Sequence, residues 1–99
     1  MTSPTDNLPP IHPGVFLKDE LEALATSARK FATRIHVPHN AITEIVNGDR
    51  AITAQMAIRL GRVFGTSAQY WMNLQSIYEL KTAQATMDDE AIEPYAAVG

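Results

Sequence analysis

One short segment carries the side chains with the clearest chemical use. Within it, PHNAITEIVNG predicts a helix of about two turns that begins at Pro38 and ends before Gly48. The polar residues His39, Asn40 and Thr43 fall opposite an apolar stripe. Asparagine can pair with adenine, threonine can contact the methyl group of thymine, and a basic side chain can meet guanine. These residue types on one outer face therefore indicate a surface that reads DNA bases.

A second group of polar and basic residues could hold a phosphate backbone. Its members are Ser27, Arg29, Lys30, Arg34 and Arg50. Ser27 stands at the start of a predicted helix, where free backbone N–H groups bind anions. The cationic side chains would add phosphate contacts, which position a protein on DNA without reading its sequence. The alternative, for both groups, is that these are ordinary solvated surface residues.

Charge is distributed unevenly along the chain. The 99 residues carry a net charge of −3, which by itself argues weakly against a nucleic-acid partner. Residues 27–65, however, hold six Lys or Arg and two Asp or Glu, while residues 1–26 and 66–99 are both acidic. A phosphate backbone responds to the local potential, so the middle of the chain is the part suited to DNA.

The elements that must position these residues are five short helices. Helix starts are expected at His12-Pro13, Thr26-Ser27, Pro38, Thr53 and Thr66, the last with Gln69 as its capping-box partner. The residues expected to face the core in the first four helices are Leu17, Leu21, Leu24, Ala28, Phe31, Ala32, Ile35, Ile42, Ile45, Val46, Ala57, Leu60, Val63 and Phe64. No segment has the pattern of a strand. The sequence thus predicts an all-α bundle whose second and third helices form a helix-turn-helix.

The chain divides into three parts. Residues 1–10 contain three prolines and no apolar period, so we expect a flexible N-terminal arm. Residues 11–85 contain the helices and form the predicted DNA-binding and dimerisation domain. Residues 86–99 form an acidic C-terminal tail.

The fifth helix has a wider apolar arc than one core seam needs. Tyr70, Trp71, Ile77 and Tyr78 lie along it together with Leu74. An aromatic surplus of this kind suits a two-fold interface, so we expect Tyr70, Trp71, Ile77 and Tyr78 at the contact of a homodimer. Such a dimer would place two reading helices about one DNA turn apart. The alternative is that the stripe only closes the core.

Other chemistries have weaker grounds. The absence of cysteine excludes disulfides and thiolate metal sites. His12, His36 and His39 lack carboxylate partners at metal-binding spacing, and no nucleophile–base pair or Gly-rich phosphate loop is present. We therefore predict no metal, no cofactor and no enzymatic activity. Without a signal-peptide pattern or a long apolar run, the chain is expected in the cytoplasm, with no membrane partner.

Three stretches give the chain a family resemblance. They are IHPGVFLKDELEAL, VPHNAITEIVNGDRAITAQMAIRLGRVFGTS and QYWMNLQSIYELKTA. All three resemble the HigA/VapI-type antitoxins, a branch of the Xre, or lambda-repressor-like, helix-turn-helix family. The resemblance covers roughly residues 11–85. It implies a lambda-repressor-like fold and a homodimer that binds the palindromic operator of its own operon. It also implies a partner, a RelE-like toxin that cleaves mRNA on the ribosome and that the protein neutralises.

The same resemblance bears on single residues. The family's recognition-helix positions match His39, Asn40 and Thr43, and its backbone contacts match Ser27 and Arg50. Two other positions depart from the family pattern. His36 stands in a turn where relatives usually have glycine, at a position that tends to need positive φ. Ala28 replaces a glutamine that many relatives carry, so one phosphate contact is expected to be missing.

Two other functions stay open at this point. The chain could be a stand-alone regulator of the same type without a toxin partner. It could also be a protein-interaction inhibitor that no longer reads DNA. A toxin-like reading frame beside the gene would favour the antitoxin, and binding to the gene's own promoter would exclude the pure inhibitor.

Overall fold

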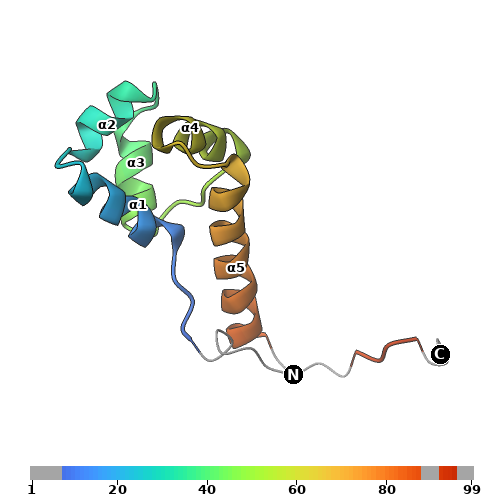
Figure 1. Ribbon diagram of the computed structural model, residues 1–99. Coiled ribbons are helices and arrows are strands. Elements are labelled where there is room, and N and C mark those ends of the chain that lie inside the picture. The colour runs from blue at the N-terminus through green and yellow to red at the C-terminus, as the bar shows by residue number, and fades with distance from the viewer. Residues whose placement is uncertain (1–7, 88–91, 96–99) are drawn as a thin grey trace.

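Five α-helices make up the fold of the residues that the structure describes. The computed structural model describes residues 8–87 and 92–95, so most of the predicted arm and much of the predicted acidic tail lie outside the described residues. The helices, in chain order, are α1 Pro13–Ala23, α2 Ala28–Arg34, α3 His39–Val46, α4 Ala54–Phe64 and α5 Ala68–Thr86 (Figure 1). The predicted all-α class, with α2 and α3 as the helix-turn-helix, is confirmed. Helices α1 to α4 form a compact head, and the long α5 extends away from it (Figure 1).

Side-chain caps fix where four of the helices begin. His12 Nδ1 accepts a hydrogen bond from the backbone N–H of Gly14. In the same way, Ser27 Oγ accepts one from the N–H of Lys30, and Thr53 Oγ1 accepts one from the N–H of Met56. These three starts are as predicted, and each cap satisfies a backbone donor that the helix leaves unpaired.

The expected start of α5 at Thr66 is wrong by one residue. Ser67 is the cap, and its Oγ accepts from the Tyr70 N–H. Thr66 has a different task, because its Oγ1 accepts at 3.0 Å from the indole Nε1–H of Trp71. That buried donor would otherwise have no partner, so tertiary packing decides which of two neighbouring hydroxyl residues caps the helix.

Left-handed residues end the first four helices. The positive φ expected at His36 is confirmed at 63°, and Ala25, Gly48 and Gly65 also have positive φ. After α1, the Thr26 N–H donates to the carbonyl of Leu21, five residues earlier in the chain. Backbone hydrogen bonds with the same spacing follow α2 and α3. Ala25 and His36 bear a strained conformation that glycine adopts freely.

Large apolar side chains from all five helices form one core. The largest fully buried ones include Trp71, Leu17, Ile42, Ile45 and Leu60. An aromatic row crosses the core from α2 through α4 to α5, since Phe31 stacks on Phe64 at 5.3 Å and Phe64 lies 5.8 Å from Trp71 between ring centroids.

Some predictions about burial need correction. Leu24 is 57% exposed, because α1 ends at Ala23 and the turn carries the chain away from the core. Ala28, Val46, Val63 and Phe64 are only partly buried, although they pack against the core. Trp71 was predicted at the dimer contact, but it is 1% exposed within the single chain and is a core residue.

The start of α1 packs closely on α3. A Cβ atom on Gly14 would collide with the backbone carbonyl of Ile45, so only glycine permits this approach. The apolar residues of α3 therefore rest directly on α1, and the opposite side of α3 is left outward.

Candidate nucleic-acid interface

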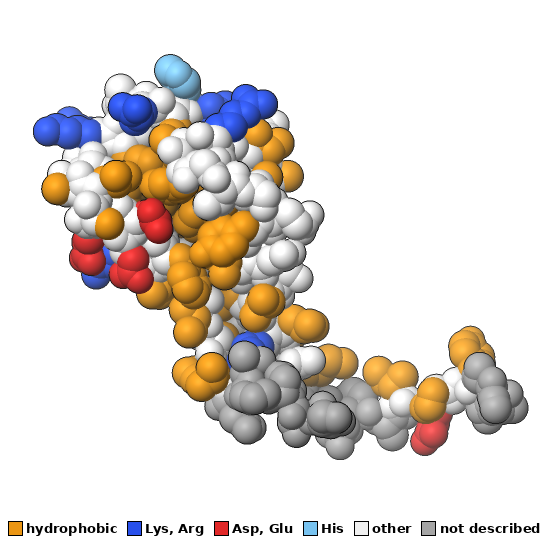
Figure 2. Space-filling view, viewed as in Figure 1, with side chains coloured by type: hydrophobic (Ala, Val, Ile, Leu, Met, Phe, Trp, Pro, Cys, Tyr) orange, Lys and Arg blue, Asp and Glu red, His pale blue; other side chains and the backbone are white. Residues whose placement is uncertain are grey.

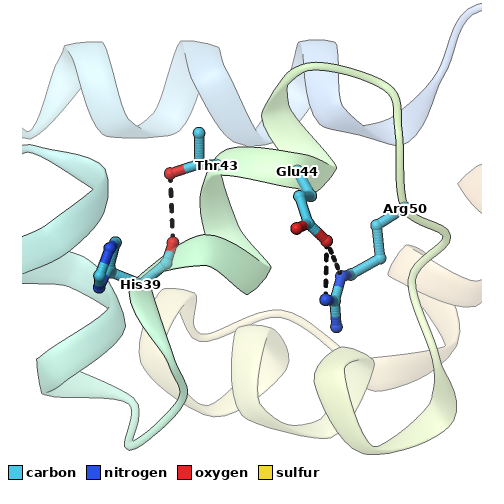
Figure 3. Close-up of polar contacts among 4 residues, drawn as sticks. All are labelled: His39, Thr43, Glu44 and Arg50. Atoms are coloured by element: carbon cyan, nitrogen blue, oxygen red, sulfur yellow. Dashed lines mark hydrogen bonds and ion pairs between the residues drawn. The ribbon is translucent and has the colours of Figure 1, made fainter.

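Helix α3 has one buried side and one exposed polar side. Ile42 and Ile45 are fully buried, while His39, Asn40 and Thr43 are exposed. The Thr43 hydroxyl donates to the carbonyl of His39 at 3.2 Å, one turn back along the helix (Figure 3). This division has the form that a reading helix needs, because its apolar side holds it to the bundle and its polar side is free to meet another molecule. The part these three residues play in reading bases stays a prediction.

Helix α2 packs against α3 and, together with its N-cap residue, presents four residues of the second predicted group. Ser27, Arg29, Lys30 and Arg34 are all exposed. Ser27 Oγ accepts from the Lys30 N–H at 3.1 Å, and its own hydroxyl hydrogen can still be donated to a phosphate oxygen. The geometry thus keeps these side chains available, and their phosphate contacts stay a prediction.

Arg50 is held by a partner that the sequence analysis did not foresee. Its Nη2 lies 2.7 Å from Glu44 Oε1, and its Nε donates to the same oxygen at 2.8 Å (Figure 3). The Arg50 hydrogen bond is the main reason that the pKa of the Glu44 carboxyl lies below its usual value, and a hydrogen bond from Asn40 acts in the same direction. The Gly48 turn, with φ of 82°, brings these residues together across six positions of sequence.

Arg59 braces the turn between α2 and α3. Its Nη1 donates at 2.8 Å to the carbonyl of Ile35, the residue that follows α2. A cation at this end of a helix satisfies a free carbonyl and complements the helix dipole. Arg59, Arg34 and Arg62 line one shallow cavity in this region. Arg59 is one of the six Lys or Arg residues between positions 27 and 65, and the sequence alone does not predict this contact.

Charge is separated over the surface of the head. Figure 2 shows Lys and Arg side chains gathered at the end formed by α2 and α4, and Asp and Glu side chains over α1. The acidic residues on α1 are Asp19, Glu20 and Glu22. A polyanion would therefore be drawn to the α2 and α4 end, as the uneven charge of the sequence predicts.

His12 joins three elements beneath the Arg50 loop. Its Nδ1 accepts from the Gly14 N–H at 2.9 Å, and its ring meets that of Tyr78 on α5 edge to face, with centroids 4.9 Å apart. Burial is the main cause that lowers the pKa of His12, while a hydrogen bond to the backbone of Arg50 and the charge of Asp49 oppose it. His12 was expected only as part of a helix start, yet it also lies beside the loop that presents Arg50.

The residues predicted at a dimer contact do not share one surface. Tyr70 and Ile77, seven residues apart on α5, are both exposed, whereas Trp71 is buried and Tyr78 is half-buried against His12. Ile77 also borders an apolar groove of about 410 Å³ between α5, α1 and the segment before α1. Its lining comprises Leu8, Ile11, Phe16, Leu74, Ile77, Leu80, Lys81 and Gln84. A dimer contact therefore stays a prediction for Tyr70, Ile77 and Tyr78.

Two further features of the described residues bear on other functions. Among residues 8–87 and 92–95, no three His, Asp or Glu side chains are grouped as metal ligands would be. Within the same ranges, every helix is too short or too polar to span a membrane.

Known proteins are similar to this chain in both sequence and fold. Residues 17–71 match the helix-turn-helix family. Virulence-associated protein I of Dichelobacter nodosus is 45% identical over 80 residues, which are 80% of this chain and 74% of that protein. An addiction module antidote protein of the HigA family from Coxiella burnetii superposes with a TM-score of 0.83 at 40% identity, over 89% of this chain and 100% of the other. The Pseudomonas aeruginosa antitoxin HigA, solved with the higBA promoter, has a TM-score of 0.82 and 48% identity, over 87% of this chain and 98% of the other.

Proposed function

The chain belongs to the helix-turn-helix family, with HigA- and VapI-type proteins among its relatives, and we propose that it is an antitoxin that binds the operator of its own operon as a dimer and represses it. One observation carries the proposal. The polar side of α3, with His39, Asn40 and Thr43, is exposed, and the isoleucines behind it are buried. Burial of that side against the protein's own helices would have prevented base reading.

The proposed docking places α3 in the major groove. His39, Asn40 and Thr43 face the base edges, and Ser27, Arg29, Lys30, Arg34 and Arg50 contact phosphates. The basic end of the head supports this orientation (Figure 2). A relative of 48% identity was solved with promoter DNA, which supports DNA as the ligand class.

The dimer is assigned to the outer side of α5. Tyr70 and Ile77 are exposed there about two turns apart, and Leu80 adds further apolar surface. Two copies joined through α5 would present two α3 helices to one palindromic site. We thus assign both DNA binding and dimerisation to residues 11–85.

The proposal also includes a toxin partner. Relatives named as an antidote protein and as antitoxins support it. We propose that the partner is a RelE-like mRNA-cleaving toxin, which this protein neutralises by binding and without catalysis, metal or cofactor. Both activities would take place in the cytoplasm. The toxin part can be tested by itself. If the product of the neighbouring gene cleaves mRNA on the ribosome, addition of this protein should suppress that cleavage.

DNA binding has a direct test. A labelled duplex from the region upstream of the gene should shift with this protein at concentrations where a scrambled duplex of equal length does not. Preference for the upstream duplex would exclude the interaction-only inhibitor. Equal binding of both duplexes would contradict the repressor. The stand-alone regulator is favoured if operator binding is seen and no neighbouring product associates with the protein.

A further inference from the structure

Glu44 lies on the outer side of α3, within the surface proposed to meet DNA. It follows Asn40 by one turn and adjoins Thr43, and both of those residues are exposed. Its Oε1 accepts a hydrogen bond from Arg50 Nε at 2.8 Å and forms an ion pair with Arg50 Nη2 at 2.7 Å (Figure 3). With α3 in the major groove, this carboxylate would lie near the base edges.

A carboxylate at this position opposes DNA binding in general. Duplex DNA carries one negative charge per about 1.7 Å of its axis. In the free protein, Arg50 offsets the charge of Glu44. A phosphate would compete for the same guanidinium, because carboxylate and phosphate both bind its N–H groups. When a phosphate takes Arg50, the charge of Glu44 is left facing the DNA without its cationic partner.

We infer that Glu44 determines specificity by penalising DNA in general and by accepting a compensating hydrogen bond from cytosine. The inference rests on the proposed function. In the major groove, the cytosine N4 amino group is the donor that a glutamate accepts from. Guanine O6 and thymine O4 are acceptors and would repel a carboxylate. Adenine presents a donor beside an acceptor, a pair that suits an amide better than a carboxylate.

Selection from a pool of randomised duplexes tests the inference and does not require the operator sequence. The wild type should enrich cytosine at one or more positions where Glu44→Gln enriches adenine, since glutamine pairs with adenine through two hydrogen bonds. The matched control is Asp49→Asn, which removes an equal charge from the adjoining loop. It should keep the wild-type sequence preference.

Affinity for random-sequence DNA gives a second readout. Glu44→Gln should bind such DNA about two- to fivefold more tightly than the wild type, and more tightly than Asp49→Asn, because it also releases Arg50. An unchanged cytosine preference in Glu44→Gln would overturn the role of Glu44 in specificity. Weaker binding of this variant to all DNA would also overturn it, since Glu44 would then only hold Arg50 in place.

The outcome also separates this inference from the proposed function. A wild-type protein that enriches no sequence would overturn both. A wild-type motif that Glu44→Gln reproduces would overturn the role of Glu44 alone. Because the Glu44 side chain is 42% exposed and lies outside the core, the variant should fold, and a thermal melt followed by circular dichroism verifies this.

Discussion

The Gln75 side chain on α5 accepts a hydrogen bond at 2.8 Å from the backbone N–H of Ile52, in the loop that precedes α4. Both residues are buried, and the Gln75 amide also donates at 2.7 Å to Glu79 Oε2. The loop between α3 and α4 presents Arg50, so α5 helps to fix the position of a proposed DNA contact. His12, the N-cap of α1, lies beside the same loop.

Replacement of Gln75 by leucine should destabilise the fold. The variant leaves the buried N–H of Ile52 without an acceptor, which costs about 1–3 kcal/mol. Urea unfolding followed by circular dichroism measures the loss. Gln69→Leu, at an exposed position on the same helix, is the control and should change stability by less than about 0.5 kcal/mol. Equal effects of the two variants would show that the Gln75–Ile52 bond adds nothing.

Folding stability should fall in mild acid because of His12. Its Nδ1 is a hydrogen-bond acceptor for the Gly14 N–H, and a protonated ring cannot keep that role. The pKa of His12 is lowered from its ordinary value of 6.5, so the folded state favours the neutral ring. The contribution of His12 to the free energy of unfolding is complete above a pH of about 6.5. It declines as the pH falls through about 6.5 towards the lower folded-state pKa. Urea unfolding between about pH 7.5 and about pH 5 should reveal the decline.

Two variants separate His12 from other titrating groups. His12→Asn retains a side chain that can cap α1 but removes the titration, so the decline near pH 6.5 should become shallower. His39→Gln, at an exposed position on α3, should keep the wild-type profile. A His12→Asn profile parallel to that of the wild type would assign the decline to another group.

Glycine at the strained helix ends should stabilise the protein. Ala25 has φ of 53° and His36 has φ of 63°, a region where a Cβ atom is unfavourable. Ala25→Gly and His36→Gly should each raise the free energy of unfolding by about 0.5–1 kcal/mol, after the greater freedom of glycine in the unfolded chain is deducted. In contrast, Ala83→Gly within α5 should lower it by about 1 kcal/mol. The prediction fails if all three variants destabilise the protein.

A charge on the outer side of α5 should weaken the dimer. Ile77 is 55% exposed in the single chain, and Ile77→Asp would place a carboxylate in the proposed contact. We expect the dimer dissociation constant to rise at least about tenfold, as measured by light scattering during size exclusion. Ile58→Asp on α4, where the isoleucine is 42% exposed, should leave it unchanged. A monomeric wild type at tens of micromolar would remove the dimer from the account.

Local patterns in the sequence predict most of the fold. The spacing of Ile42 and Ile45 gives both the helical character of α3 and the side that it buries, because one apolar stripe per helix must face the core. The Gly48 ending follows from the conformational freedom of glycine. For His36, the positive φ came from the family resemblance and not from the residue type itself.

What the sequence could not predict depends on contacts between distant residues. Thr66 and Ser67 are equally good caps in sequence, and the Trp71 indole decides between them. The sequence pattern around an aromatic residue such as Trp71 does not distinguish burial within its own chain from burial at an interface. The Glu44–Arg50 pair forms only because the intervening turn folds back.

The central claim, that the polar side of α3 reads DNA, is tested most directly by fluorescence anisotropy with Asn40→Ala and Arg50→Ala. Both are measured on the upstream duplex and on a scrambled duplex over a range of salt concentrations. Asn40→Ala should lose about 1–3 kcal/mol of preference for the upstream duplex and bind the scrambled one as the wild type does. Arg50→Ala should weaken binding to both duplexes and reduce the salt dependence by about one counterion. If neither substitution changes binding to a duplex that the wild type prefers, α3 does not contact the DNA.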